Sequence, residues 1–115
     1  MSPEHLFNLL SDSTRLRSLM LIREEQETCV CELTFTLEES QPKVSRHLAL
    51  MRDAGIVTAR REGTWMHYRI NPDLPEWASA SIAQVFQQLH GLEQFSNDRS
   101  RLKTMTNRPG GVTCG

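Results

Sequence analysis

The sequence has no run of apolar residues long enough to cross a membrane anywhere in its 115 residues. Its opening residues, Met1 to His5, also lack the basic start and apolar core of a secretory signal. A chain of this length suffices for one small domain and is too short for two ordinary ones. We therefore expect a cytoplasmic protein with one ordered domain and no membrane partner.

Cysteine is scarce, with only Cys29, Cys31 and Cys114. Three cysteines are too few for a disulfide framework, and cytoplasmic thiols are normally kept reduced. We therefore interpret them as reduced thiols or metal ligands. Small buried side chains are the alternative interpretation of Cys29 and Cys31.

Signatures of catalysis are also missing. The sequence contains no nucleophile elbow, no phosphate-binding loop and no cysteine with a matching histidine and asparagine set. An enzyme is therefore not expected, nor is a catalytic cofactor.

Positive charge is concentrated in the middle of a chain whose net charge is −1. Residues 41–69 hold six lysine and arginine residues against two acidic ones, whereas residues 1–40 hold three against eight. A local basic patch is the electrostatic footprint of a DNA-binding protein. A solvated charged face would give the same pattern, so charge alone does not decide.

The order of predicted elements indicates a winged helix-turn-helix, a mainly α fold with a small β-hairpin. Ser40 can cap a helix over residues 41–53, Pro42 suits its first turn, and Gly55 can end it in a left-handed conformation. Apolar and turn patterns predict the remaining elements. These are helices over 3–10, 14–24, 31–37 and 76–95, and strands over 56–59 and 65–70 joined by a basic turn at 60–64.

The last predicted helix has an apolar seam suited to packing against another helix. Its members alternate at spacings of four and three: Ala78, Ile82, Val85, Leu89 and Leu92. The spacing does not decide whether that second helix belongs to another copy or to the same chain. We expect residues 1–95 to form the DNA-binding and dimerisation domain and residues 96–115 to form a flexible tail.

Three stretches resemble the ArsR/SmtB family of metal-responsive repressors, especially its arsenical-resistance members. They are Leu10 to Leu16, Cys29-Val30-Cys31-Glu32-Leu33, and Ser40 to Leu48, followed by Trp65 to Arg69 as a return strand. The resemblance covers roughly residues 3–95. It implies a homodimer that represses a resistance operon, with trivalent arsenic or antimony as the inducer that lowers DNA affinity.

In helix-turn-helix proteins the second helix enters the major groove with its N-terminal residues foremost. The candidate DNA contacts on that helix are Gln41, Lys43, Ser45, Arg46 and His47. Arg60 and Arg61 are expected at the tip of the wing, against the DNA backbone or minor groove. Which of them contact bases and which contact phosphates stays open at this point.

The candidate sensor is the pair Cys29 and Cys31, because thiolates bind thiophilic ions. Residues two apart on a helix point about 200° apart. Either Cys29 therefore lies just outside the helix, or ligand binding unwinds the first helical turn and displaces the recognition helix. Related repressors often carry a third cysteine at the position of Thr34, so the third ligand stays open. The candidates are Cys114 of the same or the other subunit, a water molecule or another thiol, and the alternative interpretation of Cys114 is an uninvolved tail thiol.

Two rival functions remain from the sequence. A thiol-redox repressor would use the same two cysteines, although cysteines two apart form strained disulfides. A helical module that dimerises without binding DNA would leave the basic block and hairpin unexplained.

The pair His90 and Glu93 has the spacing of half of a zinc site found in some family members, but the other half of that site has no counterpart near residues 77–79.

Overall fold

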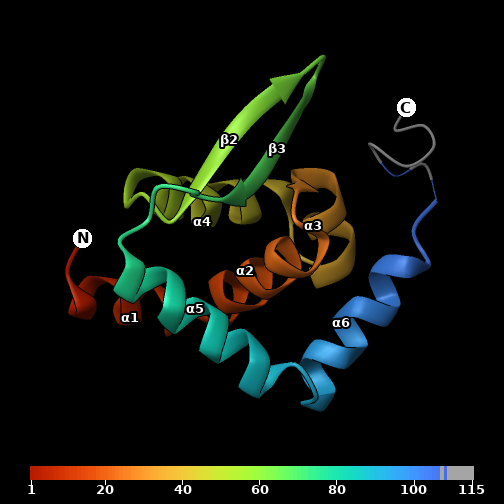
Figure 1. Ribbon diagram of the computed structural model, residues 1–115. Helices are drawn as coiled ribbons and strands as arrows, with labels where there is room; N and C mark the ends of the chain where they lie inside the picture. The colour runs from red at the N-terminus through yellow and green to blue at the C-terminus, as the bar shows by residue number, and fades with distance from the viewer. Residues whose placement is uncertain (107, 109–115) are drawn as a thin grey trace.

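The computed structural model describes residues 1–106 and 108. Helices form the body, and a long hairpin projects from it (Figure 1). The elements are α1 (Pro3–Leu10), α2 (Ser13–Glu25), β1 (Thr28–Cys29), α3 (Val30–Leu37), α4 (Gln41–Asp53), β2 (Val57–Glu62), β3 (Trp65–Ile70), α5 (Glu76–Leu89) and α6 (Glu93–Lys103). This arrangement confirms the predicted winged helix-turn-helix. Among the described residues, no helix combines the length and apolarity needed to span a membrane.

The helix-turn-helix consists of α3 and α4, and α4 has the predicted bounds. The Ser40 hydroxyl accepts the N–H of Lys43 at 3.4 Å, and Gly55 adopts a φ of 82° just after the helix. Glu38 turns the chain between the two helices with a φ of 56°. The stripe formed by Val44, Leu48 and Met51 is fully buried, so α4 is fixed to the core by one face.

The sheet has three antiparallel strands in the order β1-β3-β2. Pairing of Glu62 with Trp65 leaves a two-residue turn, Gly63 and Thr64, at the tip of the wing. The strand β2 is therefore longer than predicted, and Arg60 and Arg61 lie within it. The short β1 was not predicted; it pairs Thr28 with Tyr68 and Cys29 with His67.

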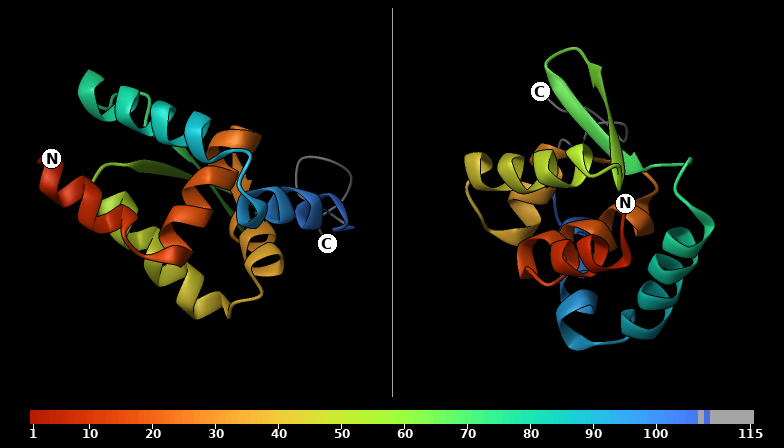
Figure 2. Two further views of the ribbon diagram at one scale, coloured as in Figure 1. Left: turned by 90° about the horizontal axis from the view of Figure 1, so that it is seen from below. Right: turned by 90° about the vertical axis from the view of Figure 1, so that its left-hand side faces the viewer.

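The prediction of one helix over 76–95 followed by a tail from residue 96 is wrong for residues 96–103. Helix α5 ends at Leu89, and after a short bend α6 packs back against α2 and α3 (Figures 1 and 2). Phe95 and Leu102 of α6 are buried, and buried Asp98 binds Arg17 through two hydrogen bonds of 2.7 and 2.9 Å. This ion pair and these two apolar side chains anchor an otherwise polar segment.

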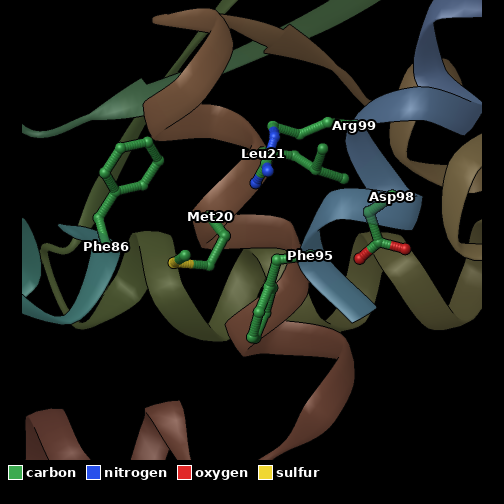
Figure 3. A pocket seen from close by; sticks show the side chains of 6 residues that line it. All are labelled: Met20, Leu21, Phe86, Phe95, Asp98 and Arg99. Carbon is green, nitrogen blue, oxygen red and sulfur yellow. The ribbon is translucent and has the colours of Figure 1, made fainter. Parts of the chain in front are cut away.

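The junction of α2, α5 and α6 contains a small cavity (Figure 3). Its volume is about 10 Å³, which is room for one water molecule at most. Its lining residues are Met20, Leu21, Phe86, Phe95, Asp98 and Arg99. The cavity is a packing defect between helices and is too small to hold a ligand.

Candidate sensor site and nucleic-acid interface

The sulfur atoms of Cys29 and Cys31 lie 3.0 Å apart, with the Cys31 thiol donating to the Cys29 thiol. Cys29 ends β1 and is the N-cap of α3, with extended backbone angles (φ −81°, ψ 150°), and Cys31 lies in the first helical turn. Cys29 is thus outside the helix, which is the first of the two predicted geometries. Because the extended residue turns its side chain back over the helix end, two cysteines two apart in sequence face each other.

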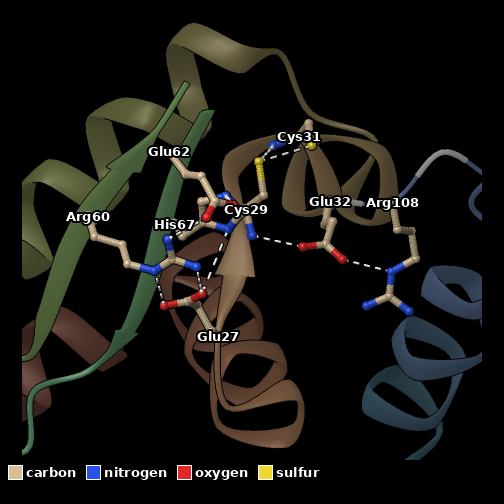
Figure 4. A network of polar contacts seen from close by, with 8 residues as sticks. All are labelled: Glu27, Cys29, Cys31, Glu32, Arg60, Glu62, His67 and Arg108. Atoms are coloured by element: carbon tan, nitrogen blue, oxygen red, sulfur yellow. Dashed lines mark hydrogen bonds and ion pairs between the residues drawn. The ribbon is translucent and has the colours of Figure 1, made fainter. Parts of the chain in front are cut away.

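The N-terminus of α3 is held by a carboxylate as well as by a thiol. Glu32 Oε1 accepts the backbone N–H of Cys29 at 2.8 Å, and Cys29 Sγ accepts the N–H of Cys31 at 3.4 Å. The second oxygen of Glu32 accepts a 2.7 Å hydrogen bond from Arg108 (Figure 4). Arg108 also binds Glu25. The thiol pair therefore lies where the chain after α6 returns to the start of α3.

The charge of Arg108 balances the buried carboxylate of Glu32, whose exposed fraction is 4%. Burial alone would lower the pKa of Arg108. Hydrogen bonds to Glu25 and Glu32 outweigh burial and hold the pKa above its ordinary value. Arg108 thus stays cationic beside Glu32, the residue that caps α3.

The third ligand was an open question, and the described residues supply none. Within residues 1–106 and 108, no group of three or more His, Cys, Asp or Glu side chains is placed to hold a metal ion. The Thr34 hydroxyl donates to the carbonyl of Val30 at 2.9 Å and stays within the helix. Cys114 lies outside the described residues. The described part of the chain therefore offers two soft donors 3.0 Å apart, a set that fits a thiophilic ion.

On the other side of Cys29 lies a cluster that sequence analysis missed. Arg60 donates to Glu27 through Nε at 2.9 Å and Nη2 at 2.6 Å, and buried His67 lies 3.9 Å from the same carboxylate (Figure 4). The hydrogen bonds from Arg60 hold the pKa of Glu27 below its ordinary value, despite partial burial. The prediction that Arg60 lies at the tip of the wing is therefore wrong: it lies in the middle of β2, level with Cys29 of β1.

The predicted DNA-contact residues of α4 differ in exposure. Gln41 and Arg46 are exposed, whereas Lys43 and Ser45 are half-buried. Lys43 forms an ion pair of 3.0 Å with Glu39 across one helical turn. These four side chains belong to the N-terminal half of α4, which is the half that contacts bases in helix-turn-helix proteins.

His47 departs from the prediction, because it is buried, with 8% of its surface exposed. Its Nδ1 lies 3.1 Å from Arg15 Nη1 and 3.9 Å from Asp12 Oδ1, so it joins α4 to the start of α2. The sequence contained the signal, since residue 47 is three after Val44 and therefore falls on the buried stripe. The buried His47 side chain therefore joins two helices and does not face the surface that the other four side chains share.

Burial lowers the pKa of His47 below its ordinary value; nearby Asp12 opposes this, while Arg15, Arg46 and Lys43 add to it. The neutral imidazole is therefore favoured inside the domain. Neutral His47 can accept a hydrogen bond from Arg15, whereas a protonated ring would face that cation with a second positive charge.

Comparison with known proteins identifies the family of the chain. The family model described as "Bacterial regulatory protein, arsR family" matches residues 12–59. The "Arsenic resistance transcriptional regulator ArsR1" of Pseudomonas putida is 47% identical over 109 residues, covering 95% of this chain and 84% of that protein. The chain belongs to the arsR family. It is accordingly a transcriptional regulator and not an enzyme.

A second relative and a solved structure are also similar to this chain. The "Arsenical resistance operon repressor" of Escherichia coli is 46% identical to this arsR-family chain over 85 residues, covering 74% of the chain and 73% of that repressor. The crystal structure of "the AntR antimony-specific transcriptional repressor" superposes with a TM-score of 0.62 at 28% identity, covering 77% of this chain and 78% of that one. The winged-helix arrangement is therefore shared with a solved repressor.

Proposed function

We propose that this arsR-family chain represses an arsenical-resistance operon and is released from its operator when trivalent arsenic or antimony binds to Cys29 and Cys31. The observation that carries the proposal is the 3.0 Å separation of the two sulfur atoms at the start of α3, the helix that precedes the recognition helix. The names of the Pseudomonas putida and Escherichia coli relatives and of the antimony-specific repressor support the choice of inducer. The proposal places the protein in the cytoplasm, where thiols stay reduced.

The proposed DNA contacts follow from exposure and charge. Gln41, Lys43, Ser45 and Arg46 of α4 are assigned to the major groove, and Arg61 of β2 to the flanking backbone. Arg60 is a weaker candidate because Glu27 already binds it. Binding that depends on such cations should weaken steeply with salt.

The proposed homodimer rests on apolar surface that the protomer leaves uncovered. Ala78 and Ile82 of the predicted seam are buried within the chain, so this part of the seam packs inside the protomer. Trp77 and Leu92 are 38% and 51% exposed, and Phe7 of α1 is 53% exposed. These exposed apolar side chains, on α1 and beyond or near the two ends of α5, are available to an association surface. A two-fold dimer would read half-sites about 34 Å apart.

The proposed release mechanism starts from the cap of α3. Trivalent arsenic in water carries hydroxides, so each As–S bond would replace an As–OH bond, and the thiol protons of Cys29 and Cys31, including the one that Cys31 now donates to Cys29, would leave with two hydroxides as water. A Cys29 sulfur that binds the ligand through its lone pairs accepts the hydrogen bond from the N–H of Cys31 less well. The first turn of α3 then loses one of its two caps while the cysteines shift to share the ligand. Because α3 packs on α4, this state disfavours the DNA-binding geometry.

Cys114 is retained in the proposal as the third ligand. Arg108 is bound to Glu32, and six further residues span about 20 Å at full extension. Since Glu32 also contacts Cys29, that length is sufficient for Cys114 to reach the pair from the same chain.

Fluorescence anisotropy of a labelled duplex carrying the upstream inverted repeat tests the proposal. Reduced wild-type protein should bind tightly at low salt, and arsenite or antimonite should reverse the binding. Cys29→Ser and Cys31→Ser should bind DNA and fail to respond, while Cys114→Ser should respond at higher arsenite concentration. Undetectable operator binding would instead support the protein-only dimerisation module.

One observation keeps a second function under test. The same 3.0 Å separation would bring the two sulfurs close enough for a peroxide-driven disulfide, at the cost of a strained ring. Release of DNA by peroxide in the absence of arsenite would favour this redox repressor. Release by arsenite under reducing conditions, with no effect of peroxide, would exclude it.

A further inference from the structure

The wing is joined to the thiol segment at two independent points, one through the backbone and one through side chains. Through the backbone, β1 pairs with β3, so that Cys29 lies opposite His67 of the wing. Through side chains, Glu27, two residues before Cys29, binds Arg60 of the outer strand β2. Thr28, which lies between Glu27 and Cys29, is completely buried. We therefore expect these three residues to move together as one segment.

The Glu27–Arg60 contact spans the sheet. Arg60 pairs with His67 across β2 and β3, and His67 pairs with Cys29 across β3 and β1. This Glu27–Arg60 ion pair, called the clamp below, starts beside β1, the edge strand that carries Cys29. It crosses the central strand β3 and ends on β2, the outer strand of the wing. Buried His67 lies next to it, 3.9 Å from Glu27 (Figure 4).

The clamp contributes position more than stability. The side chains of Arg60 and Glu27 are 50% and 30% exposed, and exposed ion pairs add little to the free energy of folding. The paired hydrogen bonds of 2.9 and 2.6 Å nevertheless fix the orientation of both side chains, because a guanidinium fits a carboxylate in one plane. A contact with fixed geometry at both ends can pass a displacement of the segment before β1 on to β2.

We propose that Glu27 is the residue that couples the thiol pair to the wing, by holding Arg60 and with it β2 in the DNA-binding position. This inference rests on the proposed function. Movement of Cys29 on ligation displaces β1 and the adjacent Glu27, and the clamp passes that displacement to the wing. The wing is thus a second route of release, separate from the contact of α3 with the recognition helix.

Coupling between two sites is reciprocal, which gives a test that needs no metalloid. If thiol segment and wing move together, bound operator DNA should hold β1 in place and slow the reaction of the cysteines with iodoacetamide. Glu27→Gln should break the clamp at nearly constant size. Glu62→Gln is the matched control, because Glu62 also contacts Arg60, at 3.4 Å, and His67, at 3.9 Å, but lies on the wing itself.

Both variants remove one negative charge near the DNA, so any general gain in affinity should be common to them. Three quantities are compared with wild type: operator affinity without arsenite, the number of arsenite ions bound, and the ratio of operator affinities without and with arsenite. A variant that changes the ratio while leaving stoichiometry intact identifies a coupling role that general loss of structure would not produce.

For Glu27→Gln we expect unchanged arsenite stoichiometry and a release ratio at least about fivefold smaller than in wild type. In a Cys114→Ser background, protection of Cys29 and Cys31 from alkylation by DNA should also decrease for Glu27→Gln and persist for Glu62→Gln. Equal release ratios and equal protection in Glu27→Gln and wild type would overturn the proposal.

Failure of the proposed function can be told apart from failure of this inference. If arsenite does not release wild-type protein, or if no operator binding is found, the alkylation rates of the free proteins decide. Glu27→Gln should then react faster than both wild type and Glu62→Gln, because β1 is held less firmly. Identical rates for the three proteins would reject the coupling role of Glu27.

Discussion

Glu32 accepts the backbone N–H of Cys29 at 2.8 Å and so closes the N-terminus of α3 directly over the cysteine that we propose as a sensor. The reciprocal contact, from the N–H of Cys31 to Cys29 Sγ, is longer at 3.4 Å, and a thiol is a weak acceptor. The carboxylate therefore carries most of the capping. Ligation of Cys29 would remove only the weaker half, which suits a helix that must loosen without unfolding.

Replacing Glu32 should destabilise the protein, since it removes this cap and leaves Arg108 with Glu25 alone. We expect Glu32→Ala to lower the free energy of unfolding by about 1–3 kcal/mol. Urea denaturation of the reduced protein measures this change. Glu93→Ala is the control, because Glu93 is an exposed acidic residue in the first turn of α6. Equal stability of the two variants would contradict the capping role.

Packing of α6 predicts a cost where a flexible tail would have none. Leu102 is 1% exposed, so Leu102→Ala should lower the free energy of unfolding by about 2–5 kcal/mol. Thermal or urea denaturation gives the value. Lys103→Ala, at the exposed neighbouring position, should change stability little. A Leu102→Ala variant as stable as wild type would restore the tail interpretation of residues 96–103.

The elements with several concurrent signals were predictable from sequence. Helix α4 has a capping serine, a first-turn proline, a regular apolar stripe and a terminal glycine, and its bounds matched the prediction. Helix α6 has two buried apolar residues, Phe95 and Leu102, and depends on the long-range pair of Asp98 with Arg17. No local pattern reveals a partner 81 residues away.

The candidate site was predictable in its chemistry and less so in its arrangement. The spacing of Cys29 and Cys31 indicated a paired thiol site, but the two-residue β1 is too short to produce a strand pattern. The predicted position of Arg60 was wrong because the turn was predicted over residues 60–64, whereas β2 continues to Glu62. The hairpin ends at Gly63, whose φ of 64° permits a tight two-residue turn.

Buried His47 predicts a pH dependence of stability with a definite sign. Its folded pKa is below the ordinary value of 6.5, because burial disfavours the charged ring. As the pH falls through 6.5 towards the folded pKa, the unfolded chain takes up a proton that the folded protein does not. Stability from this group is therefore complete above pH 6.5 and decreases on acidification. Urea denaturation at steps from pH 7.5 to 5.5 measures the slope.

His47→Gln should show a smaller decrease over that pH range, since glutamine does not titrate. His5→Gln provides the comparison, because His5 is exposed on α1 and should leave the slope near that of wild type. A slope unchanged by His47→Gln would mean that the imidazole is protonated alike in both states.

Arg46 tests the assignment of α4 as the recognition helix, because it is exposed in the N-terminal half of that helix. Arg46→Ala should weaken operator binding by about 1–3 kcal/mol if the guanidinium contacts a guanine, with loss of sequence preference at one position. If it contacts a phosphate, binding should weaken equally on all sequences, and the salt slope should fall by about one. Arg52, exposed near the C-terminal end of α4, provides a control of equal charge. Anisotropy titrations on operator and scrambled duplexes at several salt concentrations separate these two cases. Equal losses of operator affinity for Arg46→Ala and Arg52→Ala would contradict the prediction that the N-terminal half of α4 enters the groove.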